Sequence, residues 1–104
     1  MRVLQNPVEA ARWLRQRVAG ELRTDSRLVQ PGDAFIAWPG AATDVRMYLE
    51  SALQQGAAAC VLAQEGAEPW QELSDADQAE HKLERLACMA GLKAQTGLVA
   101  DAYY

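Results

Sequence analysis

Apolar residues near the start of the chain recur at helical spacing. Within residues 7–19, one face of a helix gathers Val8, Ala11, Leu14 and Val18, with Trp13 beside it. Asn6 can cap such a helix, Pro7 suits its first position, and Gly20 suits its end. The pattern therefore predicts a first helix over residues 7–19.

Two unbroken apolar runs then flank a second helical pattern. Residues 34–38 and 57–63 contain no polar side chain, which is typical of strands covered on both faces. Between them, Thr43 or Asp44 can cap a helix that ends at Gly56. Its apolar face comprises Val45, Tyr48, Leu49, Ala52 and Leu53. Strand, helix and strand in this order predict a βαβ unit with parallel strands and a right-handed crossover.

The remaining segments give weaker patterns. Residues 21–24 favour a short strand, and residues 91–103 favour a last helix. Residues 64–82 form an acidic, polar connection, interpreted as solvated surface with a short helix over residues 70–73. Residues 83–89 fit either a strand or the beginning of a long helix. Together, the predicted helices and strands indicate a small α/β domain of three layers with a mostly parallel sheet.

Composition narrows the class of function. The 104 residues suit one domain, and the net charge of -4 argues against non-specific nucleic-acid binding. No apolar run approaches the length of about 18 residues that spans a membrane, and the N-terminus lacks the apolar core of a signal peptide. We therefore expect no membrane partner and a reducing, cytoplasmic location. Cys60 and Cys88 lie in apolar runs and are interpreted as inert core thiols.

The loop over residues 39–44 is the first candidate binding site. It follows a predicted strand and opens a helix, and ligands of open α/β sheets lie beyond the carboxyl ends of strands. Residues 40–42 have almost no side chain, so an anion can approach the backbone N–H groups at Val45 and Arg46, and Arg46 can add its charge. The alternative is a plain tight connection in which Asp44 acts only as a cap.

The turn over residues 24–27 is the second candidate. Its hydroxyls and carboxylate, on Thr24, Asp25 and Ser26, can recognise a polar ring such as a base or a sugar. The alternative is that Asp25 and Ser26 only tie the turn together, with Arg27 paired to Asp25 or Asp33. Both roles are compatible.

Catalytic constellations are missing from the sequence. The phosphate-loop pattern is absent, since residues 91–97 have the wrong spacing and residue order for it. His81 is the single histidine, lies between Glu80 and Lys82 and is interpreted as a surface residue, so neither a metal site nor a Ser-His pair is expected. The residues alone thus predict a domain that binds a small molecule or an anion, without a catalytic site of its own.

The motifs of the first half resemble one protein family. They are Thr24-Asp25-Ser26-Arg27, Pro31-Gly32-Asp33, Phe35-Ile36-Ala37, Pro39-Gly40, Asp44, Arg46, Tyr48 and Gly56-Ala57-Ala58. In order and in spacing they are similar to the Rossmann-like N-terminal domain of the Mur ligases, nearest to the member that adds the third amino acid of the peptidoglycan stem peptide. Residues 90–104 resemble the end of that domain.

The resemblance implies a domain organisation and a reaction. In the family, the first domain holds the UDP end of a UDP-N-acetylmuramoyl-peptide, the second carries the phosphate loop with ATP and magnesium, and the third binds the incoming amino acid. ATP activates a substrate carboxylate as an acyl phosphate, which the amine of the amino acid attacks. Residues 1–104 are then the first domain, with no cofactor of its own, whose expected partners are the UDP-linked substrate and the two other domains of a parent ligase.

The resemblance also assigns site residues. The positions that contact the UDP-sugar in the family correspond to Thr24, Ser26, Ala41, Ala42 and Thr43. Asp25, Arg27, Asp44 and Arg46 are supporting positions. Val45 departs from the family pattern, which commonly has Gly there, because a β-branched residue does not easily adopt a positive φ.

Two alternatives stay open. The sister ligase that adds D-alanyl-D-alanine has a related first domain, with His more often where this chain has Arg46. A non-catalytic interaction module with the same fold is the second alternative. Whether the third amino acid is diaminopimelate or lysine is chosen by a domain outside these residues.

Overall fold

A five-stranded parallel sheet forms the centre of the computed structural model, which describes residues 2–40, 44–67 and 85–104. Its strands are β1 (Arg2–Leu4), β2 (Leu22–Arg23), β3 (Ala34–Ala37), β4 (Ala59–Ala63) and β5 (Leu86–Met89). Their order across the sheet is β1-β5-β4-β3-β2, and every adjacent pair is parallel. The predicted α/β domain with a parallel sheet is confirmed.

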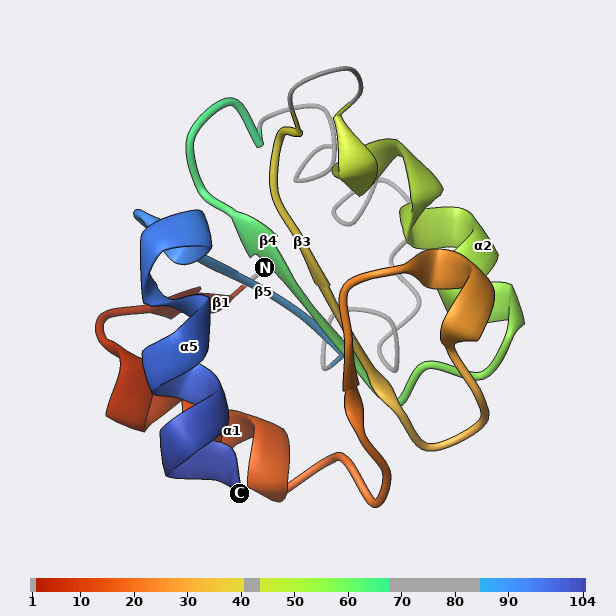
Figure 1. Cartoon of the computed structure of the whole chain (residues 1–104), viewed down its shortest axis with the longest axis horizontal. Helices are drawn as coiled ribbons and strands as arrows, with labels where there is room; N and C mark the ends of the chain where they lie inside the picture. The colour runs from red at the N-terminus through yellow and green to blue at the C-terminus, as the bar shows by residue number, and fades with distance from the viewer. Residues whose placement is uncertain (1, 41–43, 68–84) are drawn as a thin grey trace.

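Helices cover both faces of this sheet, giving three layers (Figure 1). They are α1 (Pro7–Arg15), η1 (Ser26–Leu28), η2 (Val45–Tyr48), α2 (Leu49–Gln54) and α5 (Leu92–Tyr103), where η marks a 3-10 helix. In Figure 1, α1 and α5 lie together on one face, and α2 lies on the other. Side chains alternate along the strands, so Ala34 and Ile36 join the core beneath α1 and α5, whereas Phe35 and Ala37 join the core beneath α2.

The direction of the strand steps explains these layers. From β2 to β5 the chain steps across the sheet in one direction, whereas the step from β1 to β2 passes from one edge to the other in the opposite direction. Because parallel crossovers are right-handed, the helix of the reverse step belongs on the opposite face. This places α1 opposite α2, as the two cores show.

The first helix is shorter than predicted. Asn6 caps it as expected, with its Oδ1 accepting from the Glu9 N–H at 2.8 Å. It ends at Arg15 rather than at residue 19, because the chain tightens there and both Arg17 and Val18 donate their N–H groups to Leu14. The placement of Val8 on its buried face was wrong, since Val8 is 59% exposed.

The strands differ from the prediction mainly at the ends of the chain. The sequence pattern did not predict β1, in which only Leu4 is buried. The open choice for residues 83–89 is settled as a strand over Leu86–Met89, all of it buried. The second predicted helix begins as the 3-10 turn η2 before it continues as α2.

Several predicted features lie outside the described residues. They are Ala41, Ala42 and Thr43, His81, the short helix over residues 70–73 and most of the acidic connection. Within the described residues, no helix has the length and apolar character needed to cross a membrane. Cys60 and Cys88 are buried and form no disulfide, in agreement with the prediction, and burial raises the pKa of Cys60 to about 12.

Candidate functional site

The turn after β2 is closed by a compact Asp-x-Arg unit. Asp25 Oδ1 accepts from the Arg27 N–H at 2.9 Å and caps η1. The Arg27 guanidinium returns to both carboxylate oxygens, with Nε to Oδ1 at 3.0 Å and Nη2 to Oδ2 at 2.8 Å. The Arg27 side-chain hydrogen bond is the main cause that lowers the pKa of Asp25 to about 2. Arg27 is therefore paired with Asp25, one of the two partners considered from the sequence.

Asp33, the other partner considered for Arg27, stabilises the same turn through residues on both sides of it. Its Oδ1 accepts from the Glu21 N–H at 2.9 Å, and its Oδ2 accepts from the Gln30 N–H at 3.0 Å and from Arg23 Nε at 3.1 Å. Burial acts to raise the pKa of Asp33, but these hydrogen bonds outweigh it and the pKa is lowered. Gly20 is required beside this carboxylate, since a Cβ there would lie 2.1 Å from Asp33 Oδ1.

A second Asp-x-Arg unit follows β3. Asp44 Oδ1 accepts from the Arg46 N–H at 3.1 Å, and Asp44 Oδ2 pairs with Arg46 Nη2 at 2.7 Å. Arg46 Nη1 also donates to the carbonyl oxygens of Ala63 at 2.8 Å and Glu65 at 2.6 Å. The Arg46 hydrogen bond is the main cause that lowers the pKa of Asp44.

These contacts bear on the predicted anion site at the start of the second helix. The Arg46 N–H is taken by Asp44, and the Arg46 side chain is only 4% exposed. Its guanidinium therefore joins the end of β4 to the loop after β3. A contact between Arg46 and a ligand stays a prediction to which this geometry adds no support.

A groove of about 570 Å³ brings the first turn against the second helical segment. It is lined by Thr24, Asp25, Ser26, Arg27, Val45, Tyr48, Ser51 and Gln55. Its volume lies within the range of about 300–1,000 Å³ typical of small-molecule sites. The sequence-predicted turn thus forms one wall of a concave surface, and η2 with α2 forms the other.

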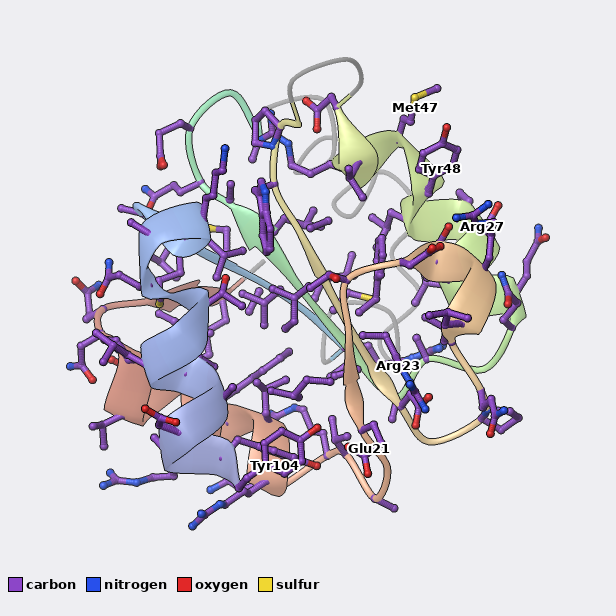
Figure 2. The ribbon with its side chains drawn as sticks, viewed as in Figure 1. Glu21, Arg23, Arg27, Met47, Tyr48 and Tyr104 are labelled. Atoms are coloured by element: carbon purple, nitrogen blue, oxygen red, sulfur yellow. The ribbon has the colours of Figure 1, made fainter. Side chains whose placement is uncertain are left out.

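The helical wall contains residues that the sequence reasoning did not select. Tyr48, Ser51 and Gln55 follow one another at i, i+3 and i+7, so they share one face of the segment. The apolar pattern had assigned Tyr48 to the buried face, but Tyr48 is 41% exposed. Figure 2 shows Tyr48 and Arg27 on the same side of the molecule, over η2 and η1. The spacing of the two polar residues, Ser51 and Gln55, was the signal that could have identified this face.

A second hollow, of about 490 Å³, lies at the carboxyl ends of the central strands. It is lined by Trp38 and Pro39 after β3, Ala63 and Glu65 at the end of β4, and residues 91–94 at the start of α5. The helices after β3 and β5 lie on opposite faces, and ligands of such sheets bind where the crossovers change face. Of this lining, the sequence singled out only Pro39, in the loop over residues 39–44, because the remaining residues come together through the strand order.

The C-terminal helix is tied to the entry of β2. Tyr103 Oη donates to the Gly20 carbonyl oxygen at 2.8 Å. Tyr104 Oη lies 2.6 Å from Glu21 Oε2 and accepts from the Leu22 N–H at 3.0 Å, and Figure 2 shows Tyr104 beside Glu21. These contacts fix the strand that carries the turn over residues 24–27. Among the described residues, no three His, Cys, Asp or Glu side chains cluster as metal ligands would.

Comparison with known proteins gives one consistent result. No protein-family model matches the chain. The chain is 51% identical over 96 residues to the UDP-N-acetylmuramoyl-L-alanyl-D-glutamate--2,6-diaminopimelate ligase of Acidovorax sp., covering 92% of this chain and 17% of the relative. Proteins of the same name from Pseudomonas aeruginosa and Haemophilus ducreyi are 42% and 33% identical, covering 81% and 88% of this chain. The chain spans only 15–19% of the length of these relatives.

Proposed function

We propose that this chain, which belongs to the Mur ligase family, is the domain that anchors the UDP end of a UDP-N-acetylmuramoyl-dipeptide. The relatives that it matches are diaminopimelate ligases, and the chain corresponds to one segment of them. The parent reaction is the ATP-dependent addition of the third amino acid of the peptidoglycan stem peptide. ATP and magnesium belong to the remaining domains of that ligase. In this proposal the domain binds the substrate, and the reaction takes place in the other domains.

The observation that carries this proposal is the groove between the turn after β2 and the η2–α2 segment. Thr24 and Ser26, the positions that the family resemblance assigns to the UDP-sugar, both line it. Asp25 and Arg27 line the same wall and neutralise each other, so the groove does not repel a diphosphate. Ala41, Ala42 and Thr43 complete the proposed site from the loop after β3.

An NMR titration of the 104-residue chain with UDP tests this function, with UMP and ATP as controls. We expect saturable shifts at residues 24–27 and 41–46 that are selective for UDP. The absence of shifts at millimolar UDP contradicts anchoring by this domain alone. A longer chain that includes the segment following residue 104 in the relatives then shows whether the rest of the ligase is needed.

Ser26 is the side chain on which the proposed contact depends most. It is buried at the base of the turn, and Ser26→Ala removes its hydroxyl without enlarging the residue. We expect UDP binding to weaken by about 1–2 kcal/mol if the hydroxyl forms a hydrogen bond with the ligand. Unchanged affinity in a folded Ser26→Ala variant excludes this residue from the site, and a chemical-shift map of the free variant checks the fold.

A further inference from the structure

We propose that the outer groove between α1 and α5 docks an acidic amphipathic helix of a partner protein. This α1–α5 groove is a hollow of about 160 Å³ lined by Val8, Ala11, Arg12 and Arg15 of α1 and by Ala102 of α5. It lies in the layer opposite α2 and shares no lining residue with the groove proposed for UDP (Figure 1). The inference therefore goes beyond the proposed function and is tested independently of it.

The two helices present the α1–α5 groove on a rigid support. Arg15 Nε donates to the Tyr103 carbonyl oxygen at 3.0 Å, and Arg15 Nη2 donates to the Ala102 carbonyl oxygen at 2.7 Å, which joins the end of α1 to the end of α5. On the inner side, Leu14 of α1 and Val99 of α5 are buried in the same core. The outward side chains of both helices are therefore held in place, and a rigid surface loses less entropy on binding than a loop does.

Exposed aliphatic side chains belong to this surface on both helices. Val8 of α1 is 59% exposed and lines the groove. Leu98 of α5 is 58% exposed and lies one turn before Ala102, so it shares the face of α5 that lines the groove. The lining also includes the small side chains of Ala11 and Ala102, over which a partner helix can approach closely. This combination suits the apolar face of an amphipathic helix, whose anchoring residues recur one helical turn apart.

The charge on the outer face of α1 is positive and is not balanced by the described part of the chain. Arg12 is exposed, lines the groove and forms no side-chain hydrogen bond or ion pair with any described residue. It also lines a second hollow, of about 430 Å³, to which Arg2 contributes. Glu9, the single acidic residue of α1, is already paired with Arg2 at 3.6 Å and accepts from the Gln5 N–H at 3.1 Å. Arg12 therefore remains available to a carboxylate of a partner.

The short length of this basic surface favours a helix over an extended polyanion. The nine residues of α1 span about 13 Å, whereas the whole chain has a net charge of -4. A nucleic acid or an anionic bilayer would extend beyond α1 over a protein whose net charge has the same sign as its own, and the two would repel. Carboxylates one turn apart on a single helix place their charge on α1 alone, and the apolar residues between them cover Val8 and Leu98. Charge complementarity thus identifies the partner as an acidic helix.

The test titrates the 104-residue chain with a blocked peptide that repeats the unit Glu-Leu-Ala-Ala-Leu-Glu-Ala, followed by NMR. Two control peptides replace every glutamate by glutamine or every leucine by alanine. Arg12→Glu reverses the charge in the groove, and Lys93→Glu makes the same change at an exposed position of α5 that does not line it. Val8→Ser removes an exposed apolar side chain from the groove, and Met47→Ser removes one that is 60% exposed over η2, where Figure 2 shows it.

We expect saturable shifts at residues 8–16 and 98–102, and weaker binding of both control peptides. Arg12→Glu weakens binding of the acidic peptide about tenfold, because like charges then face each other across the interface. Val8→Ser weakens it about threefold, since less apolar area is covered. Lys93→Glu and Met47→Ser stay within about twofold of the unchanged chain, because they lie away from the groove. Far-ultraviolet circular dichroism confirms that the variants are folded.

Several results would overturn the inference. They are an absence of shifts at millimolar peptide, equal affinity in Arg12→Glu and the unchanged chain, or an equal loss in Lys93→Glu, which indicates attraction by net charge alone. Tighter binding of single-stranded DNA or of phosphatidylserine vesicles at the same residues assigns the face to a polyanion instead. Loss of peptide binding in a chain that includes the segment following residue 104 in the relatives assigns the face to the rest of the ligase. Failure of the unchanged chain to bind UDP contradicts anchoring alone and leaves this inference in place.

Discussion

Two Asp-x-Arg turns follow neighbouring strands in this molecule and make the same internal contacts in opposite environments. In each, the Asp carboxylate accepts from the backbone N–H two residues later and pairs with the guanidinium of that residue. The Arg27 side chain is 86% exposed, whereas that of Arg46 is 4% exposed. The same three-residue pattern therefore produces a surface pair after β2 and a buried joint after β3.

The position of the strand in the sheet accounts for the difference. β3 is an interior strand, so the carboxyl end of its neighbour β4 presents the carbonyl oxygens of Ala63 and Glu65 to Arg46. β2 is an edge strand, and the described residues provide no further strand beside its carboxyl end to receive Arg27. The edge turn thus leaves its Asp–Arg pair at the surface, and the interior turn uses its arginine to join neighbouring strand ends.

Among the variants that test this comparison, Arg46→Ala is expected to cause the largest loss of stability. The substitution leaves two carbonyl oxygens without their guanidinium donor and the Asp44 carboxylate with only the backbone N–H of residue 46, so we expect the free energy of unfolding to fall by about 3 kcal/mol. Urea unfolding measures the loss, and Arg46→Lys recovers part of it because lysine keeps the charge but not the fork of donors. Arg27→Ala is the matched control and lowers the free energy of unfolding by less than about 1 kcal/mol, because its ion pair with Asp25 is exposed. Equal losses of stability in Arg46→Ala and Arg27→Ala would contradict a structural role confined to Arg46.

Asp33→Asn tests whether Asp33 stabilises the turn after β2, where the arginine is exposed and not buried. Asp33 joins Glu21, Gln30 and Arg23 through three hydrogen bonds to one carboxylate. We expect a loss of about 2 kcal/mol in the free energy of unfolding, because the amide carries no charge and has a single acceptor oxygen. Arg23→Ala removes only the partly exposed ion-pair partner and costs less than about 1 kcal/mol. A loss at Asp33→Asn no larger than at Arg23→Ala assigns the effect to the ion pair.

The smallest expected effect is a change in the pKa of Asp25 when Arg27 is removed. The pKa of Asp25 lies at about 2, below its ordinary value of 3.8, so the carboxylate stays charged until the pH falls well below 4. A lowered pKa favours the folded state above the ordinary value, and this contribution is lost as the pH falls through the folded value. Carboxyl chemical shifts should give a midpoint near 2 for Asp25 in the unchanged chain and move toward 3.8 in Arg27→Ala. An unmoved midpoint excludes Arg27 as the cause.

Elements with long or unbroken apolar patterns were predictable, and the short edge strand β2 was predicted within residues 21–24, but the edge strand β1 was not. The runs at residues 34–38 and 57–63 contain β3 and β4, because strands covered on both faces leave a continuous apolar signal. β1 was missed because two of its three residues are exposed, and its pairing with β5 depends on residues far along the chain. The family resemblance, stated from motifs alone, is confirmed by the relatives.

The candidate site was only half predictable. Thr24, Asp25, Ser26 and Arg27 form a contiguous turn, so the sequence shows them together. Tyr48 appeared to be a core residue, and the burial of Arg46 was not expected, since charge indicates surface until a neighbouring strand provides acceptors. Proximity across the groove depends on the packing of η1 against α2, which no local pattern encodes.

The strand order also determines when β1 can join the sheet during folding. β1 is synthesised before the other four described strands, but Arg2 pairs with Ala87, and among the described residues β5 is its only neighbour in the sheet. Its place is completed only after β5 has been synthesised and has joined β4. Pairs so distant in sequence raise the contact order and slow folding, because the loop must close before the contact stabilises anything. Nascent chains that end before β5 therefore carry β1 without the strand that it pairs with, and we expect β1 to be the last of the described strands to gain protection from hydrogen exchange.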